Sequence, residues 1–219
     1  MTRNDDSTIS TLASAGIKWR NSYPEIRTER LLLRIPRMSD AEALALYRRE
    51  NWDHLGRWEP TRPRSWTTAD FSRTRISADR EQALAGYAYQ FLMELTGDDV
   101  EGERLVGTLR VGDIARASMY LASVGYGLDH RCQGRGLMRE ALTAAIRFAF
   151  DDLGLHRLEA SYMPANERSG RLLEHCGFQI EGLMRGSIRV QGNWEDHYLA
   201  SLLNDAWKEP EPGRLSSWR

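Results

Sequence analysis

The residues best placed to do chemistry lie in one short glycine-rich loop, 131–136, between an apolar, β-prone run and a predicted helix. Gly134 and Gly136 have no Cβ, so the backbone there can curl and come close to a ligand. A helix that begins at 136 or 137 offers unpaired N–H groups and the positive end of its dipole. Together these features predict an anion site, and the natural guest is a phosphate or pyrophosphate.

Side chains and competing patterns narrow this prediction. Arg131 and Arg135 would add positive charge to the loop, and Gln133 would add a neutral donor. The Walker A pattern is absent, and the dinucleotide-binding pattern would need a third glycine where Arg139 stands. For the loop taken by itself, a plain strand-to-helix turn that uses glycine for geometry alone stays an open alternative.

Composition indicates a single-domain protein. Its 219 residues are enough for one domain with a substantial core, and its formal charge of −1 gives no bulk attraction to nucleic acid or membranes. Two cysteines, Cys132 and Cys176, do not make a disulfide scaffold, and no apolar leader or membrane-length run occurs. His130 and Cys132 alone are too few to hold zinc, so we expect no metal. We expect a cytoplasmic protein without direct nucleic-acid or membrane partners.

Periodicity and turn residues predict one domain over 23–207, between a loosely ordered arm at 1–22 and a mobile tail at 208–219. The expected helices are 40–49, 67–86, 136–151 and 166–175, and the expected strands are 30–35, 87–96, 104–114, 120–128, 156–163, 178–190 and 195–203. A turn is expected at 97–99. The segment 51–66 looks irregular and carries three tryptophans, and long loops with aromatic residues are often functional.

The loop Arg131-Cys-Gln-Gly134-Arg-Gly136 matches the R/Q-x-x-G-x-G/A pattern of the GNAT N-acetyltransferases, which holds the pyrophosphate of coenzyme A. Further segments resemble the bacterial RimJ branch of that family, the ribosomal-protein-alanine N-acetyltransferases. These segments are 133–147, 156–157, 162–166, 168–170, 177–178, 192–194 and 196–197. The resemblance covers about 28–207 and is most specific over 125–197.

The resemblance implies the α/β (α+β) GNAT fold, a mixed, mostly antiparallel sheet with flanking helices. In that fold the strands at 120–128 and 156–163 splay apart at one end, and the pantetheine arm of the acetyl-CoA co-substrate bonds to the exposed strand edge. The resemblance assigns the contacts with coenzyme A to Val124, Tyr126, Arg131, Cys132, Gln133, Gly134, Arg135, Gly136, Leu137, Met138, Asn166, Ser169 and Arg171.

Two of these residues also carry proposed chemistry. Asn166 and Ser169 stand three apart at a predicted helix start, so both can face one ligand. The resemblance places Asn166 on the pantetheine amide and the Ser169 hydroxyl near the thiol. The oxyanion should be held by a backbone N–H, which the resemblance places at Val124, Gly125 or Tyr126, so Tyr126 joins Ser169 as a catalytic candidate. Without the family match, Asn166 is only a helix cap and Ser169 only a first-turn residue.

The expected general base is Glu59, in a Trp-Glu-Pro triplet that also occurs in the RimJ branch. A carboxylate there could face the amine and attract a cationic N-terminus, whereas an ordinary surface glutamate is the alternative. Glu94 and Glu159 are the fallback bases. Trp58, Glu59 and Trp194 are expected to contact the acceptor, although Trp194 could instead only fix the last hairpin.

These assignments predict an acetyl-CoA-dependent N-acetyltransferase in which an amine attacks the thioester directly. A protein α-amine has a pKa near ~7.7–8.0, against ~10.4 for lysine, so an N-terminal acceptor suits a site without a strong base. The RimJ resemblance makes a ribosomal protein the expected acceptor. The alternatives are a small-molecule amine (polyamine, aminoglycoside or amino acid) and a non-catalytic acyl-CoA-binding assembly factor. The sequence does not define the oligomeric state.

Overall fold

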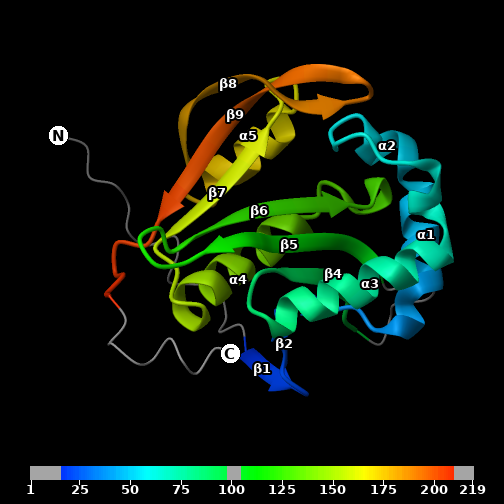
Figure 1. The fold of residues 1–219 in the computed structure, drawn as a ribbon, viewed down its shortest axis with the longest axis horizontal. Helices are drawn as coiled ribbons and strands as arrows, with labels where there is room; N and C mark the ends of the chain where they lie inside the picture. The colour runs from blue at the N-terminus through cyan, green and yellow to red at the C-terminus, as the bar shows by residue number, and fades with distance from the viewer. Residues whose placement is uncertain (1–15, 98–104, 210–219) are drawn as a thin grey trace.

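A computed structural model describes residues 16–97 and 105–209 of the chain. One nine-stranded mixed sheet runs through it in the order β1-β2-β3-β4-β5-β6-β7-β9-β8 (Figure 1). The strands are β1 (Gly16–Arg20), β2 (Tyr23–Arg27), β3 (Leu31–Arg34), β4 (Tyr89–Leu95), β5 (Leu105–Ala115), β6 (Leu121–Leu128), β7 (Arg157–Tyr162), β8 (Gln179–Val190) and β9 (Asn193–Leu203). The helices are α1 (Ala41–Glu50), α2 (Trp52–Gly56), α3 (Ala69–Leu84), α4 (Leu137–Arg147) and α5 (Glu167–His175). This is the mixed, mostly antiparallel sheet with flanking helices that the resemblance implied.

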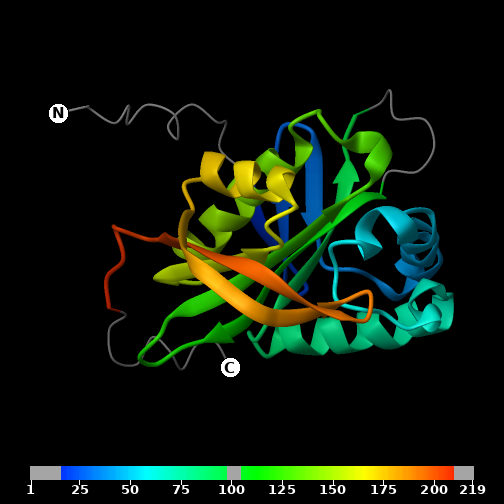
Figure 2. The same cartoon turned by 90° about the horizontal axis from the view of Figure 1, so that it is seen from above.

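Helices cover both faces of the sheet. Helices α4 and α5 lie on one face, and α1 and α3 lie on the other (Figure 2). Strand β4 contributes side chains to the hydrophobic clusters on both faces, because successive side chains of a strand point to opposite faces. Phe91 and Met93 belong to the large core cluster that includes α4, whereas Leu92 joins a smaller cluster with Leu44 of α1 and Ile76 of α3. The sheet is therefore fixed from both sides and forms a rigid base for a site.

Helix α4 forms because apolar residues recur at helical spacing after a glycine that ends the preceding loop. Leu137, Met138, Ala141, Leu142 and Ala145 are all buried against the sheet. The helix runs on into a wide π-helical turn, Phe148–Asp152, so the predicted helix at 136–151 is confirmed in extent. This packing holds the N-terminus of α4 beside the end of β6.

The two central strands β6 and β7 part as predicted. They pair in parallel only from Leu121 with Arg157 to Ser123 with Glu159. Beyond that point β6 stays paired with β5, and β7 stays paired with β9. One edge of β6 is therefore without a strand partner from Val124 onward, which leaves backbone groups open to an extended ligand.

The structure differs from the prediction at the N-terminal side. β1 pairs with β2 in a hairpin, although 16–20 was expected to belong to a loosely ordered arm. Four of the five β1 residues are exposed, so the strand lacks the alternation that marks a half-buried strand, and its turn uses Asn21 and Ser22 at positive φ instead of glycine. Helix α2 likewise lies inside the segment expected to be irregular.

The rest of the arm (1–15), the end of the tail (210–219) and most of the predicted turn at 97–99 lie outside the described residues. None of the helices in the described part of the chain combines the length and the apolar character needed to span a membrane.

Candidate active site

The loop after β6 is built around a buried carboxylate. Asp129 is 2% exposed, and its side chain accepts hydrogen bonds from the backbone N–H of Arg131 at 2.8 Å and from Asn51 Nδ2 at 3.2 Å. Arg131 Nε also donates to it at 3.0 Å. Burial alone would raise the pKa of Asp129, but the hydrogen bonds from Arg131 and Asn51 lower it to about 2. The ionised carboxylate therefore holds the loop in one shape.

Arg131 is consequently a loop anchor in this structure. Its guanidinium also pairs with Glu50 at 2.6 Å, so both of its carboxylate partners belong to the protein. Burial and the charge of Asp129 raise the pKa of the Cys132 thiol, while Arg135 and Arg131 act in the opposite direction. Arg131, Cys132 and Arg135, predicted to bind the cofactor, do not line the cleft described below.

Gly134 and Gly136 supply the predicted curl. Both have φ of +75°, a left-handed conformation that favours glycine. A Cβ added at Gly134 would meet no atom of residues 16–97 or 105–209 within 4 Å, so its face of the loop is open to a ligand. Gly136 caps α4 without a side chain, which leaves the first N–H groups of the helix available to an anion.

A second set of contacts secures the start of α4. Arg30 donates to the carbonyl oxygen of Arg135 at 2.8 Å and pairs with Glu140, in the first turn of α4, at 2.7 Å. Glu140 also accepts a hydrogen bond from Thr28 Oγ1 at 2.5 Å. The anion-binding end of α4 is thus tied to the β2–β3 turn and is organised before any ligand arrives.

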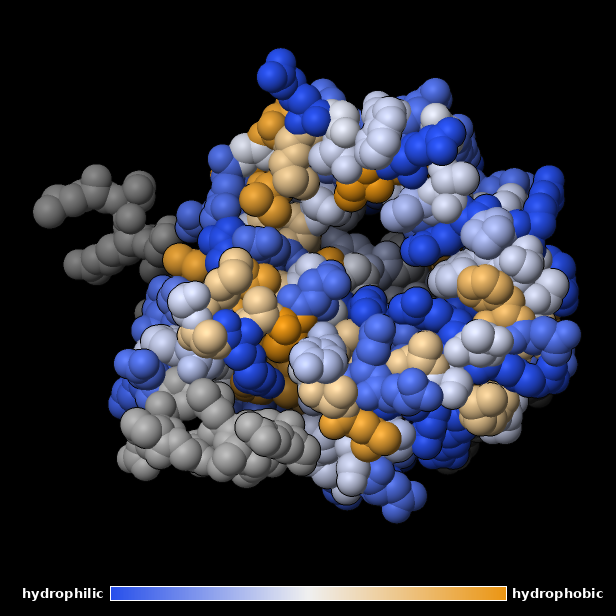
Figure 3. Space-filling view, in the orientation of Figure 1, coloured by the Kyte–Doolittle hydropathy of each residue, from blue (hydrophilic) through white to orange (hydrophobic). Residues whose placement is uncertain are grey.

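The parted strands open a cleft of about 1720 Å³ between the β8–β9 side of the molecule and the α1–α2 side (Figure 3). The cofactor residues predicted from the sequence that line it are Val124, Tyr126, Gln133, Gly134, Gly136, Leu137, Met138, Asn166, Ser169 and Arg171. The structure therefore brings together the glycine loop, the open edge of β6 and the start of α5, which are up to 47 residues apart in the chain.

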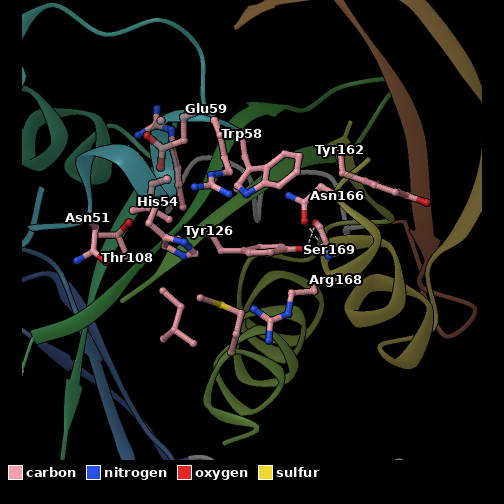
Figure 4. Close-up of a pocket in the computed structure, with 18 of the residues that line it drawn as sticks. Asn51, His54, Trp58, Glu59, Thr108, Tyr126, Tyr162, Asn166, Arg168 and Ser169 are labelled. Atoms are coloured by element: carbon pink, nitrogen blue, oxygen red, sulfur yellow. Dashed lines mark hydrogen bonds between the residues drawn. The ribbon is translucent and has the colours of Figure 1, made fainter. Parts of the chain in front are cut away.

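At one end of the reaction zone, Tyr126 of β6 meets the first turn of α5. Its hydroxyl lies 2.9 Å from Ser169 Oγ, and Asn166 Oδ1 accepts a hydrogen bond from the backbone N–H of Ser169 at 3.3 Å (Figure 4). Burial raises the pKa of Tyr126, so its phenol stays protonated. Asn166 is both the predicted helix cap and a cleft residue. Ser169 is thus held in a hydrogen-bonded, uncharged environment.

At the other end, Glu59 lies over strand β6. A Cβ built on Gly127 would sit 3.5 Å from Glu59 Oε1 and 3.4 Å from the Tyr47 hydroxyl oxygen, so both oxygens approach the same point above a residue that has no side chain. Burial raises the pKa of Glu59, while Arg62 and Arg48 act in the opposite direction. The carboxyl is therefore poised closer to neutral pH than a surface glutamate.

Tyr47 of α1 also lines the cleft, and no sequence motif pointed to it. It is 3% exposed, and its hydroxyl has no hydrogen-bond partner among the described residues. Burial and the charge of Glu59 raise its pKa. A buried hydroxyl without a partner is costly, which indicates that it serves a ligand or a water in the cleft.

The two fallback bases, Glu94 and Glu159, bind arginines outside the cleft. Glu94 binds Arg34, whose Nε donates to it at 3.2 Å, and Glu159 pairs with Arg157 at 2.8 Å. Neither carboxylate lines the cleft. Within the described ranges, no group of three or more His, Cys, Asp or Glu side chains could hold a metal ion.

Two bridges cross the cleft. Arg168 of α5 donates to Gln133 Oε1, and Gln133 Nε2 donates to His54 Nε2 of α2 at 2.8 Å. On the acceptor side, the backbone N–H of Thr61 donates to the carbonyl of Arg189 at 3.1 Å, and Gly192 N–H donates to Thr61 Oγ1 at 3.2 Å. The segment that carries Glu59 is thus joined to the β8–β9 turn.

Of the predicted acceptor contacts, Trp58 and Glu59 line the cleft. Trp194 does not line it and is 68% exposed beside Gly186 on the β8–β9 hairpin, which corresponds to the structural alternative. Arginines of α1, of the loop after α2 and of β5 also line the cleft, namely Arg48, Arg62 and Arg110. No local pattern marked them, because they meet only through the packing of separate elements.

Comparisons with known proteins agree with this geometry. The model of the Acetyltransferase (GNAT) domain matches residues 30–179. The chain is 35% identical over 198 residues to [Ribosomal protein uS5]-alanine N-acetyltransferase of Escherichia coli (strain K12), covering 90% of this chain and 98% of that protein. It is also 35% identical over 167 residues to the probable N-acetyltransferase YjcK of Bacillus subtilis, covering 76% and 90%.

Solved structures give the same result. The ribosomal-protein-S5-alanine acetyltransferase of Vibrio fischeri superposes with a TM-score of 0.79 at 34% identity, covering 84% of this chain and 99% of that one. Mycobacterium smegmatis RimJ in complex with CoA-disulfide gives 0.75 at 28% identity, covering 93% of each chain. A glycine loop at a helix start, a parted pair of central strands and matches along most of its length show that this chain belongs to the GNAT acetyltransferase family.

Proposed function

We propose that this protein transfers an acetyl group from acetyl-CoA to the N-terminal α-amine of a protein, and that the acceptor is a ribosomal protein in the cytoplasm. One observation carries the proposal: acid–base groups lie at two neighbouring residues of the open part of β6. The hydroxyl of Tyr126 contacts that of Ser169, and the carboxylate of Glu59 lies over Gly127. The names of the Escherichia coli and Vibrio fischeri relatives support the ribosomal acceptor.

The residues present fit coenzyme A. The open face at Gly134, the uncapped start of α4 and the unpaired edge of β6 follow one another along the cleft. A diphosphate would bind the N–H groups of the loop and helix, and the pantetheine amides would bond to β6 and Asn166. Acetyl-CoA supplies the activated acetyl thioester.

Side chains of the protein then transfer two protons, one from the attacking amine and one to the leaving sulfur. Transfer forms a C–N bond and breaks the thioester C–S bond, so the amine must lose a proton and the leaving sulfur must gain one. Glu59, with its raised pKa, accepts the proton directly or through a water that Tyr47 also binds. Ser169 donates a proton to the sulfur and is oriented by Tyr126. A backbone N–H of 124–126 stabilises the developing oxyanion.

The test combines purified protein with cells. Acetyl-CoA and peptides that copy ribosomal-protein N-termini are mixed with the protein, free thiol is followed, and mass spectrometry locates the acetyl group. N-terminal mass spectrometry of ribosomal proteins from cells with and without this gene then identifies the acceptor. Acetylation of lysine side chains or small amines alone, or no thiol release with any amine, would refute the proposal.

A further inference from the structure

Four arginines gather at the acceptor end of the cleft, beyond Glu59. These cleft residues are Arg48, Arg62, Arg75 and Arg110. We propose that they form a subsite for an acidic side chain of the acceptor, carried by one of the residues that follow its N-terminus. The inference rests on the proposed function, because a peptide acceptor places the side chains of its first residues at set distances from its amine.

The first observation is a pair of like charges held at one indole. The guanidinium carbon of Arg48 lies 3.8 Å from the ring centroid of Trp66, and that of Arg62 lies 4.5 Å from it. Arg48 Nη1 donates to the Trp66 carbonyl at 3.3 Å and to Ser72 Oγ at 3.1 Å, and both of these acceptors are uncharged. Burial, together with the charge of Arg62, lowers the pKa of Arg48 to about 10. The positive charges of Arg48 and Arg62 are therefore not balanced by negative charge at Trp66.

The second observation is the shortage of counter-charge. Asp79 is 3% exposed and serves two arginines, Arg75 at 3.0 Å and Arg110 at 3.4 Å. Within the described residues, neither Arg48 nor Arg62 has a carboxylate within 4.0 Å. The charge of Asp79 also raises the pKa of Arg48, although Asp79 pairs with Arg75 and Arg110. The charge of Glu59 acts on Arg48 in the same direction, and the proposed mechanism uses Glu59 at the amine. An incoming carboxylate would supply the missing charge.

The third observation is reach. In the sheet, Gly127 of β6 pairs with Thr108 of β5, which pairs with Leu92 of β4, while Gln90 pairs with Arg110. From Gly127 to β4 the cleft floor spans two strand spacings, about 10 Å, which is the length of about three extended residues. A peptide whose amine lies at Glu59 would therefore place the side chain of its second, third or fourth residue among the arginines.

The excess positive charge argues against a polyamine, and the bridge over the cleft argues against a nucleic-acid strand. A polyamine would bring further positive charges into a zone that already holds an excess of them, so its binding is disfavoured. The bridge from Thr61 to the β8–β9 turn covers this side of the cleft, which suits a single extended chain end better than a nucleic-acid strand. An acidic side chain near an N-terminus satisfies both restrictions.

The experiment uses peptides that share an N-terminal alanine and carry Glu, Gln or Lys at position 2, 3 or 4. We expect wild-type kcat/KM for the best Glu peptide to exceed that for its Gln partner about tenfold, with a difference that shrinks as salt rises. Arg62→Glu should remove this preference and favour Lys. Arg64→Glu, an equal charge change on the same exposed segment but outside the cleft lining, should keep the wild-type preference.

The outcomes separate the two proposals. Equal rates for Glu, Gln and Lys peptides at every position, or an Arg62→Glu variant with unchanged preference, would overturn the subsite and leave the N-acetyltransferase proposal standing. Equal effects of Arg62→Glu and Arg64→Glu would show a general charge effect and would also overturn it. Acetylation of none of the peptides would overturn the proposed function and the subsite with it.

Discussion

Replacing Gly134 by alanine tests whether the loop meets the diphosphate of coenzyme A. In the free protein the added Cβ would have no neighbour within 4 Å, so the substitution causes no clash. Its cost in stability comes from φ of +75°, a left-handed conformation that costs an L-residue about 1–2 kcal/mol. For a protein of this size we expect Tm to fall by roughly 2–4 °C per kcal/mol.

Gly154 provides a matched control. It has φ of +63°, and a Cβ added there would also meet nothing within 4 Å, but it follows the π-helical turn and does not line the cleft. Gly154→Ala should therefore cost about the same free energy of unfolding, about 1–2 kcal/mol. Any difference between the two variants in ligand binding then reports on the ligand and not on backbone strain.

The expected difference can be worked out. The Cβ of Gly134→Ala would project into the space where a phosphate oxygen has to approach backbone N–H groups. Loss of one charge-assisted hydrogen bond is worth about 1.5–3 kcal/mol, which is roughly a tenfold to hundredfold loss of affinity. We expect calorimetry to show this loss for Gly134→Ala and unchanged coenzyme A affinity for Gly154→Ala. Equal affinities for the two variants would refute the placement of the diphosphate at this loop.

Other predictions concern the acid–base groups. Glu59→Gln should lower kcat/KM at least about a hundredfold and abolish the acidic limb of the pH profile, because in the wild type the rate falls as pH drops through the raised pKa of Glu59; an unchanged limb would contradict its role. Tyr47→Phe should leave the fold intact, since the hydroxyl has no hydrogen-bond partner in the described part of the chain, and should slow acetylation without weakening coenzyme A binding. An unchanged rate would leave the hydroxyl without a function. Ser169→Ala should lower kcat and change KM little, and Tyr126→Phe should lower kcat by a smaller factor. If steady-state kinetics show the larger loss of kcat for Tyr126→Phe, Tyr126 is the proton donor and Ser169 orients it. In the folded protein the pKa of Asp129 is lowered from 3.8 to about 2, so ionised Asp129 contributes about 2 kcal/mol to the free energy of unfolding above pH ~4. This contribution is lost as pH falls toward 2. Asp129→Asn should lower the free energy of unfolding at pH 7 by that amount, and denaturant unfolding at pH 7 and pH 3 measures it.

The parts of the site that could be predicted from sequence are those fixed by local physics. Gly134 and Gly136 have the positive φ that their position required, and Asn166 caps α5 with its side chain. The parting of β6 and β7 came from the family resemblance, since periodicity defines a strand but not its neighbours. These features depend on residues close in the chain or on a pattern shared by a family, so the sequence contains them.

Arg131 shows why charge near a loop is a weaker guide. It stands two residues after Asp129, and a buried carboxylate with two free lone-pair directions captures the nearest guanidinium. The sequence contains both residues, but Asp129 also accepts a hydrogen bond from Asn51, which is 78 positions earlier. Spacing alone does not show that Asp129 and Glu50 already pair with Arg131, whose contact with coenzyme A stays a prediction.

The acceptor side could be predicted only in part, for the same reason. Glu59 was found through a short triplet, whereas Tyr47 and Arg48 differ from other residues of α1 only in what packs against them. Their partners come from β6 and from the loop before α3, and those contacts exist only once the sheet has formed. Long-range packing, which no local pattern records, decides which of many charged residues lies in a cleft.

The two ends of the cleft differ in charge, and this difference favours one kind of amine. At the Ser169 end, where we propose that the sulfur lies, the hydroxyls of Tyr126 and Ser169 are uncharged and can lend a proton but do not attract an ammonium ion. At the other end burial raises the pKa of Glu59 while Arg48 and Arg62 oppose that rise, so the carboxylate is more basic than one in water. The same arginines disfavour a second positive charge beside it, so a bound amine loses its proton more readily. An α-amine, with a pKa near ~7.7–8.0, needs only this modest help, whereas a lysine side chain near ~10.4 would need about two to three units more. The electrostatics of the cleft thus select for the chain end, independently of which protein carries it.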